Sequence, residues 1–138
     1  MQHKKLVINT DGGSRSNPGP AGIGVVIKTE DSELVYEHGE YIGEATNNVA
    51  EYKALIHALE TSKALQATDL LIQMDSELIV KQMQGLYKIK EPTLQVLASE
   101  VKKLLTNFDK FTFKHVFREF NKEADAMVNK AIDAALEK

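Results

Sequence analysis

The chain has 138 residues, of which 43% are hydrophobic and 27% charged, with a formal net charge of −3 and no cysteine. This length predicts a single domain over residues 1–138, long enough to bury a core. The lack of cysteine excludes a disulfide scaffold and thiolate chemistry, so any metal ligands must be histidines or carboxylates. No apolar run approaches the roughly 20 residues of a membrane helix, and the N-terminal residues lead into a strand rather than a signal peptide, which predicts a cytoplasmic protein without membrane contact.

The charge is uneven along the chain. Eight lysines or arginines and only three acids lie between Lys81 and Arg118, so the remainder is acidic in total. The small negative net charge argues only weakly against a nucleic-acid partner, because it does not describe how charge is distributed.

The first third predicts three strands. The segments KKLVINT (4–10), IGVVIKT (23–29) and ELVYEHGEYIG (33–43) have strand character, with turn residues around Asn17 to Pro20 and near Asp31. Short connections between them predict an antiparallel meander. The first strand is expected to end at Asp11, which two glycines follow.

The remaining chain alternates helices and strands. A 3.6-residue apolar stripe begins at Val49, after the capping candidates Thr46 to Asn48. Strands are predicted at DLLIQM (69–74) and FTFKHVF (111–117), and helices at SELIVKQMQ (76–84), TLQVLASEVKKLL (93–105) and KEADAMVNKAIDAAL (122–136). The order βββαβααβα predicts an α/β fold with a mixed sheet, antiparallel on one side, parallel where helices intervene, and covered by helices.

Four carboxylates stand out: Asp11, Glu51, Asp75 and Asp125. Each alone has an ordinary structural interpretation. Asp11 fits an Asp-Gly turn, Glu51 a capping box, Asp75 a helix N-cap, and Asp125 the first turn of a helix, where the dipole favours negative charge. Asp125, however, borders the buried face of its helix, an awkward place for an unpartnered charge.

Together the four carboxylates indicate a metal site. Asp11 and Asp75 mark the carboxyl ends of strands, the edge at which sheets with parallel strands bind ligands. Neighbouring carboxylates repel one another unless a cation neutralises them. A cluster without cysteine or a suitably spaced histidine pair is the ligand set for Mg²⁺ or Mn²⁺.

Four segments in order, TDGGSRSNPGPAGIG, ATNNVAEYKALIHALE, IQMDSELIVKQ and HVFREFNKEADAMVNKAI, resemble the successive signatures of type 1 ribonuclease H, in its compact archaeal and Gram-positive-like branch. The resemblance covers essentially the whole chain. It implies a single ribonuclease H domain over 1–138, with a ribonuclease H-like fold whose five-stranded mixed sheet has the order 3-2-1-4-5 and is flanked by helices. The implied activity is endonucleolytic hydrolysis of the RNA strand of an RNA/DNA hybrid, leaving 5′-phosphate and 3′-hydroxyl ends.

The resemblance also implies site residues. The Asp-Glu-Asp-Asp set of the family falls on Asp11, Glu51, Asp75 and Asp125, which would hold two Mg²⁺ ions, or Mn²⁺ as a substitute, for two-metal-ion catalysis. The implied substrate contacts are backbone approach at Gly12 and Gly13, sugars at Ser14 and Asn17, a DNA phosphate at Thr46, and bases or 2′-hydroxyls at Asn47 and Asn48. Ser76 would steady Asp75 or cap a helix, and helix capping is an equal alternative for residues 46–48.

The sequence departs from the longer bacterial enzymes at two places. The loop REFNKEAD (118–125) lacks their histidine, and His115, which alternates with phenylalanines, is expected in the core. We expect Arg118 to assist near the scissile phosphate. Asn121, which like Arg118 matches the compact branch, is expected to contact the substrate. The basic insertion of the longer enzymes is also absent, so we expect Lys88 and Lys90 to bind the substrate more weakly than that insertion does and with a stronger dependence on salt.

Two other functions fit the fold: a non-catalytic nucleic-acid-binding module, and another nuclease such as an exonuclease or integrase-like enzyme. The four intact carboxylates disfavour the first alternative, and the asparagine pair with DGGSRSNPGPAG disfavours the second. The expected partner is an RNA/DNA hybrid, bound by a monomer.

Overall fold

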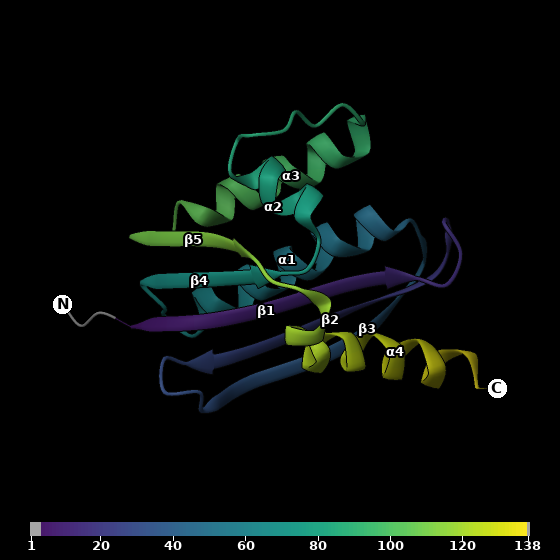
Figure 1. Cartoon of the computed structure of the whole chain (residues 1–138), viewed down its shortest axis with the longest axis horizontal. Helices are drawn as coiled ribbons and strands as arrows, with labels where there is room; N and C mark the ends of the chain where they lie inside the picture. The colour runs from purple at the N-terminus through teal and green to yellow at the C-terminus, as the bar shows by residue number, and fades with distance from the viewer. Residues whose placement is uncertain (1–3, 138) are drawn as a thin grey trace.

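The computed structural model describes residues 4–137 and contains a five-stranded mixed sheet of order β3-β2-β1-β4-β5 (Figure 1). Strands β1 (Lys5–Ser14), β2 (Gly19–Thr29) and β3 (Leu34–Ala45) form an antiparallel meander. Strands β4 (Asp69–Met74) and β5 (Lys110–His115) extend it in parallel. The predicted fold class and strand order are confirmed.

Helices cover both faces of the sheet. Helices α1 (Asn47–Ala64), α2 (Glu77–Met83) and α3 (Pro92–Leu105) lie on one face, and α4 (Lys122–Leu136) crosses β2 and β3 on the other (Figure 1). A short 3₁₀ turn, η1 (Arg118–Phe120), joins β5 to α4. Among the described residues, no helix combines the length and apolar character needed to cross a membrane.

Strand β1 is longer than the sequence predicts. It pairs with β2 as far as Ser14, whereas its parallel pairing with β4 stops at Thr10 opposite Met74. Asp11 therefore lies inside the strand, not in a turn, but just beyond the parallel ladder. Asp75 follows Met74 directly, so the ends of this ladder place the two aspartates side by side.

The two glycines after Asp11 have different surroundings. A Cβ atom at Gly12 would overlap the carbonyl group of Ala50 and the amide nitrogen of Glu51, so only glycine allows α1 to pack this closely on β1. A Cβ atom at Gly13 would meet only Val128, at an ordinary 3.6 Å. The packing of α1 on β1 therefore accounts for the glycine at position 12 without any substrate contact. Close approach of the substrate to the backbone at Gly13 stays a prediction.

The predicted core position of His115 is wrong. Only Phe113 of the alternating set is buried, at 6% exposed, whereas Phe111 and Phe117 are 44% and 66% exposed. His115 is partly exposed and packs edge-on against Phe117, with ring centroids 5.7 Å apart. The alternation does not continue because β5 ends at His115 and the chain then turns into η1.

Candidate active site

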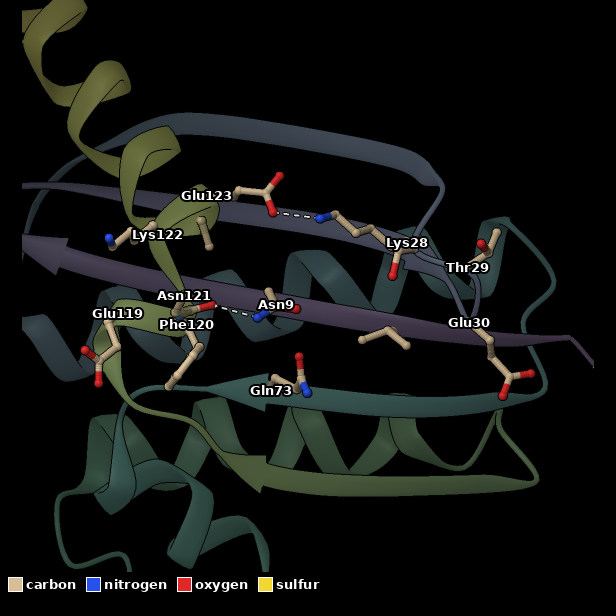
Figure 2. Close-up of a pocket in the computed structure, with 13 residues that line it drawn as sticks. Asn9, Lys28, Thr29, Glu30, Gln73, Glu119, Phe120, Asn121, Lys122 and Glu123 are labelled. Atoms are coloured by element: carbon tan, nitrogen blue, oxygen red, sulfur yellow. Dashed lines mark hydrogen bonds and ion pairs between the residues drawn. The ribbon is translucent and has the colours of Figure 1, made fainter.

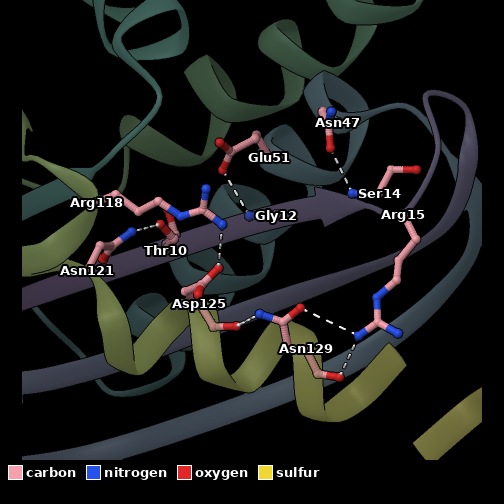
Figure 3. Close-up of polar contacts among 10 residues, drawn as sticks. All are labelled: Thr10, Gly12, Ser14, Arg15, Asn47, Glu51, Arg118, Asn121, Asp125 and Asn129. Atoms are coloured by element: carbon pink, nitrogen blue, oxygen red, sulfur yellow. Dashed lines mark hydrogen bonds and ion pairs between the residues drawn. The ribbon is translucent and has the colours of Figure 1, made fainter. Parts of the chain in front are cut away.

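The structure brings the four predicted carboxylates together. Oxygen atoms of Asp11, Glu51 and Asp75 lie within 4.8 Å of one another. Asp125 reaches the same cluster from α4, within hydrogen-bonding reach of the Asp11 carboxyl. The cleft around them is lined by these residues together with Gly12, Gly13, Ser14, Arg15, Asn47, Arg118, Val128, Asn129 and Ile132. Figure 3 shows Glu51 and Asp125 approaching β1 from opposite sides.

The capping interpretations of Glu51 and Asp75 are wrong. Thr46 is the N-cap of α1 and accepts a hydrogen bond from the Val49 amide at 3.2 Å. Glu51 lies beyond the first turn, is 7% exposed and accepts a hydrogen bond from the Gly12 amide at 2.9 Å (Figure 3). Ser76, rather than Asp75, caps α2. Both carboxylates are therefore free of helix capping and face the cleft.

Burial and mutual repulsion disfavour charge on this cluster. Burial, followed by repulsion from Asp75 and the hydrogen bond with Asp125, raises the pKa of Asp11 to about 8. Burial also raises the pKa of Glu51 well above its ordinary value, although the Gly12 amide opposes this shift. The pKa of Asp75 is raised mainly by burial, against hydrogen bonding from Asn121 and the charge of Arg118. A bound divalent cation would reverse these shifts because it stabilises the ionised carboxylates.

The donor chemistry of the cluster fits a hard divalent cation. The four side chains offer only carboxylate oxygens, the ligands that Mg²⁺ and Mn²⁺ accept, and they provide no sulfur or imidazole nitrogen for a softer metal. Burial and mutual repulsion make the ionised cluster unfavourable by itself, and a bound cation would offset that electrostatic cost.

Residues at the start of α1 hold the β1–β2 loop. The Ser14 amide donates to Asn47 Oδ1 at 2.7 Å (Figure 3), and the Asn47 amide donates to Asn17 Oδ1 at 3.1 Å. Ser14 also donates its hydroxyl to the Ser16 carbonyl. Asn47 and Asn17 are exposed and Asn48 is partly exposed, so the rim keeps polar atoms open to solvent. Thr46 caps helix α1, as the capping alternative for residues 46–48 predicted.

Asn121, predicted to contact substrate, is buried. Its side chain is 1% exposed, donates to the Thr10 carbonyl at 2.9 Å and accepts from Asn9 Nδ2 at 3.0 Å (Figures 2 and 3). Because it also hydrogen-bonds Asp75, Asn121 is a positioning residue that fixes the loop before α4 against β1. Direct substrate contact by this side chain is not supported by the structure.

Arg118 lies at the mouth of the cleft. Its guanidinium is 3.6 Å from Asp125 Oδ1, and its side chain is 80% exposed (Figure 3). Its position in η1, just after β5, directs it to the cluster. Lys88 and Lys90, in contrast, are exposed in the loop between α2 and α3, and neither lines the carboxylate cleft.

Three polar residues near the site were not singled out from the sequence. Asn9 supports Asn121, while Arg15 forms an ion pair with Asp133 at 2.7 Å and contacts the Asn129 carbonyl at 3.4 Å. Asn129 in turn donates to the Asp125 carbonyl at 3.1 Å (Figure 3). Asn9 could have been noticed because it is a polar residue inside an otherwise apolar strand. Arg15 and Asn129 could not have been paired from the sequence, because they come together only in the folded chain.

Comparison with known proteins agrees with the observed fold. A family model described as reverse transcriptase-like matches residues 9–131. A bifunctional protein of Mycobacterium tuberculosis is 46% identical over 132 residues, 95% of this chain but 36% of its own length. Ribonuclease HI of Halobacterium salinarum is 44% identical over 125 residues, covering 91% of this chain and 63% of the relative. The chain thus spans about a third of the mycobacterial relative and under two thirds of the halobacterial one.

A solved structure of LC11 ribonuclease H1 in complex with an RNA/DNA hybrid is 49% identical, with a TM-score of 0.91, and the match covers 95% of this chain and 99% of that one. The fold is that of the ribonuclease H class. The chain belongs to the type 1 ribonuclease H family.

Proposed function

We propose that this chain is an endonuclease that hydrolyses the RNA strand of RNA/DNA hybrids, with two Mg²⁺ ions held by Asp11, Glu51, Asp75 and Asp125. The observation that carries this proposal is the convergence of these carboxylates in one cleft. The similarity to a ribonuclease H1 solved with an RNA/DNA hybrid supports the choice of substrate.

Each side chain has a defined part in this mechanism. Asp11 and Asp75, adjacent at the ends of the β1–β4 ladder, would hold the ions together with Glu51 from α1 and Asp125 from α4. When bound, the ions supply an activated water for in-line attack on phosphorus and stabilise the leaving 3′ oxygen. Arg118 places a positive charge beside the cluster, where it would assist at the scissile phosphate.

The rim supplies the candidate contacts that distinguish RNA from DNA. Exposed amide groups of Asn17 and Asn47, with Asn48 beside them, can reach bases or 2′-hydroxyls in a shallow minor groove. Backbone at Gly13 can come close to the RNA strand because no side chain stands there. Further contacts are assigned to Gly12, Ser14, Thr46, Ser76, Lys88 and Lys90 on the family resemblance.

A monomer suffices for this activity. All four carboxylates come from one chain, so no second copy is needed to complete the cluster. A cytoplasmic location, expected from the sequence, belongs to the same proposal.

The test compares labelled RNA/DNA hybrid, duplex DNA and duplex RNA, each incubated with Mg²⁺, with Mn²⁺, and with a chelator. We expect chelator-sensitive internal cutting of the hybrid RNA strand, absent in Asp75→Asn. Hybrid binding without cutting would favour the non-catalytic module. Cutting of duplex DNA, or release of single nucleotides from an end, would favour another nuclease of this fold.

A further inference from the structure

A second group of metal-ligating side chains lies away from the carboxylate cleft. Tyr36, His38 and Glu40 alternate along the edge strand β3 and pair with Ile27, Val25 and Ile23 of β2. Val25 and Ile27 belong to the core beneath α1, so the three β3 side chains project toward the same helix. His57 of α1 meets them there.

The four side chains form a connected cluster. The rings of His38 and His57 stack with centroids 4.5 Å apart and planes 11° from parallel. The Tyr36 hydroxyl and His57 Nε2 are 2.7 Å apart, and His38 Nε2 lies 2.9 Å from Glu40 Oε1. Possible ligand atoms of His38, Glu40 and His57 all lie within 4.8 Å of one another. None of these residues lines the carboxylate cleft.

We propose that His38, His57 and Glu40 bind one Zn²⁺ ion that links the edge strand β3 to helix α1. Two imidazole nitrogens and one carboxylate oxygen, completed by water, are a ligand set that zinc accepts in proteins. Mg²⁺ and Mn²⁺ prefer oxygen ligands, so the two sites of this chain select different cations.

The present arrangement shows what binding must change. The lone pairs of stacked imidazoles lie in nearly parallel planes and do not meet at one point, so one ring must rotate about its Cβ–Cγ bond. The His38 side chain has freedom for this rotation because it is 34% exposed on an edge strand. The hydrogen bond between His38 and Glu40 is then replaced by coordination of both side chains to zinc. The Tyr36 hydroxyl keeps its contact with His57 and orients that ring.

Zinc at this position would stabilise the folded chain and would take no part in catalysis. Among the described strands, β3 is bonded only to β2, and it makes few contacts with α1. A ligand that binds the folded chain alone stabilises it by mass action, and zinc at about 100 times its dissociation constant should raise Tm by about 5–10 °C.

The experiment uses untagged protein in the Asp75→Asn background, which weakens ion binding at the carboxylate cluster, with Mg²⁺ present throughout. Tm is measured with and without ZnCl₂ for this parent and for added His38→Gln, His57→Gln or His115→Gln. We expect the zinc-dependent rise to be lost in the first two variants and kept with His115→Gln. Since each rise is referred to the same variant without zinc, any destabilisation by the substitution itself cancels.

A spectroscopic measurement identifies the ligands directly. Cu²⁺ added in equimolar amount should give an electron paramagnetic resonance spectrum with hyperfine splitting from two imidazole nitrogens, reduced to one in His38→Gln. Zinc stabilisation and nitrogen splitting that persist in both His38→Gln and His57→Gln, or that vanish only with His115→Gln, would overturn the proposal. Neither readout depends on nuclease activity.

Discussion

Replacing Asp11 by asparagine should stabilise the metal-free protein at alkaline pH. In the unfolded chain this carboxyl ionises near its ordinary pKa of 3.8, whereas in the folded chain its pKa is about 8. Between these values the folded state holds a proton that the unfolded state has lost, so the free energy of unfolding falls as pH rises through this window. The asparagine amide does not ionise and can still donate a hydrogen bond to Asp125.

The size of the effect follows from the displaced pKa. One pKa unit corresponds to about 1.4 kcal/mol, so retaining the Asp11 proton at pH 7 costs up to about 4 kcal/mol of folding free energy. We therefore expect Asp11→Asn to raise the free energy of unfolding by about 2–4 kcal/mol at pH 8 in chelator, and by less than half of that at pH 5.

Urea unfolding at pH 5 and pH 8, with chelator or with saturating Mg²⁺, measures these quantities. Asp31→Asn, in an exposed turn, is the matched control and should change little under any condition. With Mg²⁺ the order should reverse, because the wild type gains ion binding that the variant has lost. An Asp11→Asn protein that is less stable than wild type at pH 8 in chelator, or a difference independent of pH, would refute the electrostatic account.

Three further predictions concern the rest of the site. Gly12→Ala should lower the free energy of unfolding by about 3 kcal/mol or more, because its methyl group must displace α1, whereas Gly13→Ala should keep wild-type Tm. If Gly13→Ala also keeps full hybrid cleavage, close backbone approach is the wrong explanation for that glycine. Arg118→Ala should reduce kcat on a hybrid about tenfold or more, with a smaller change in KM; full turnover would remove it from catalysis. Lys88→Ala with Lys90→Ala should raise KM and flatten its salt dependence, and unchanged kinetics would place both outside the interface.

The element order and the mixed sheet could be predicted because periodicity and connection length are local properties of a sequence, whereas the strand order 3-2-1-4-5 was implied by the family resemblance. Short loops and helical crossovers favour particular strand pairs, so no distant contact is needed to infer the mixed sheet. The four carboxylates could also be chosen, since strand ends and helix starts are visible in the pattern.

Features that depend on contact between distant segments could not be predicted. Glu51 looks like a capping residue until the Gly12 amide is found opposite it. Position 12 must be glycine because the backbone of Ala50 packs against it, and Asn121 is held by a hydrogen bond to the Thr10 carbonyl. In both cases the partner is distant in the sequence. His115 was expected in the core because it shares a face of β5 with the buried Phe113, but it is the last residue of that strand, where the chain leaves the sheet toward η1, and it stays partly exposed.

The position of Asp125 links the proposed nuclease activity to the packing of both layers of the domain. Glu51 arrives on α1 from one face of the sheet, and Asp125 arrives on α4 from the other (Figure 1). A ribosome delivers α4 last among the described helices, so the first three ligands emerge without the fourth. A chain still being synthesised, or one whose α4 has come loose, would lack a complete ion site, and the proposed cutting activity would begin only when folding ends.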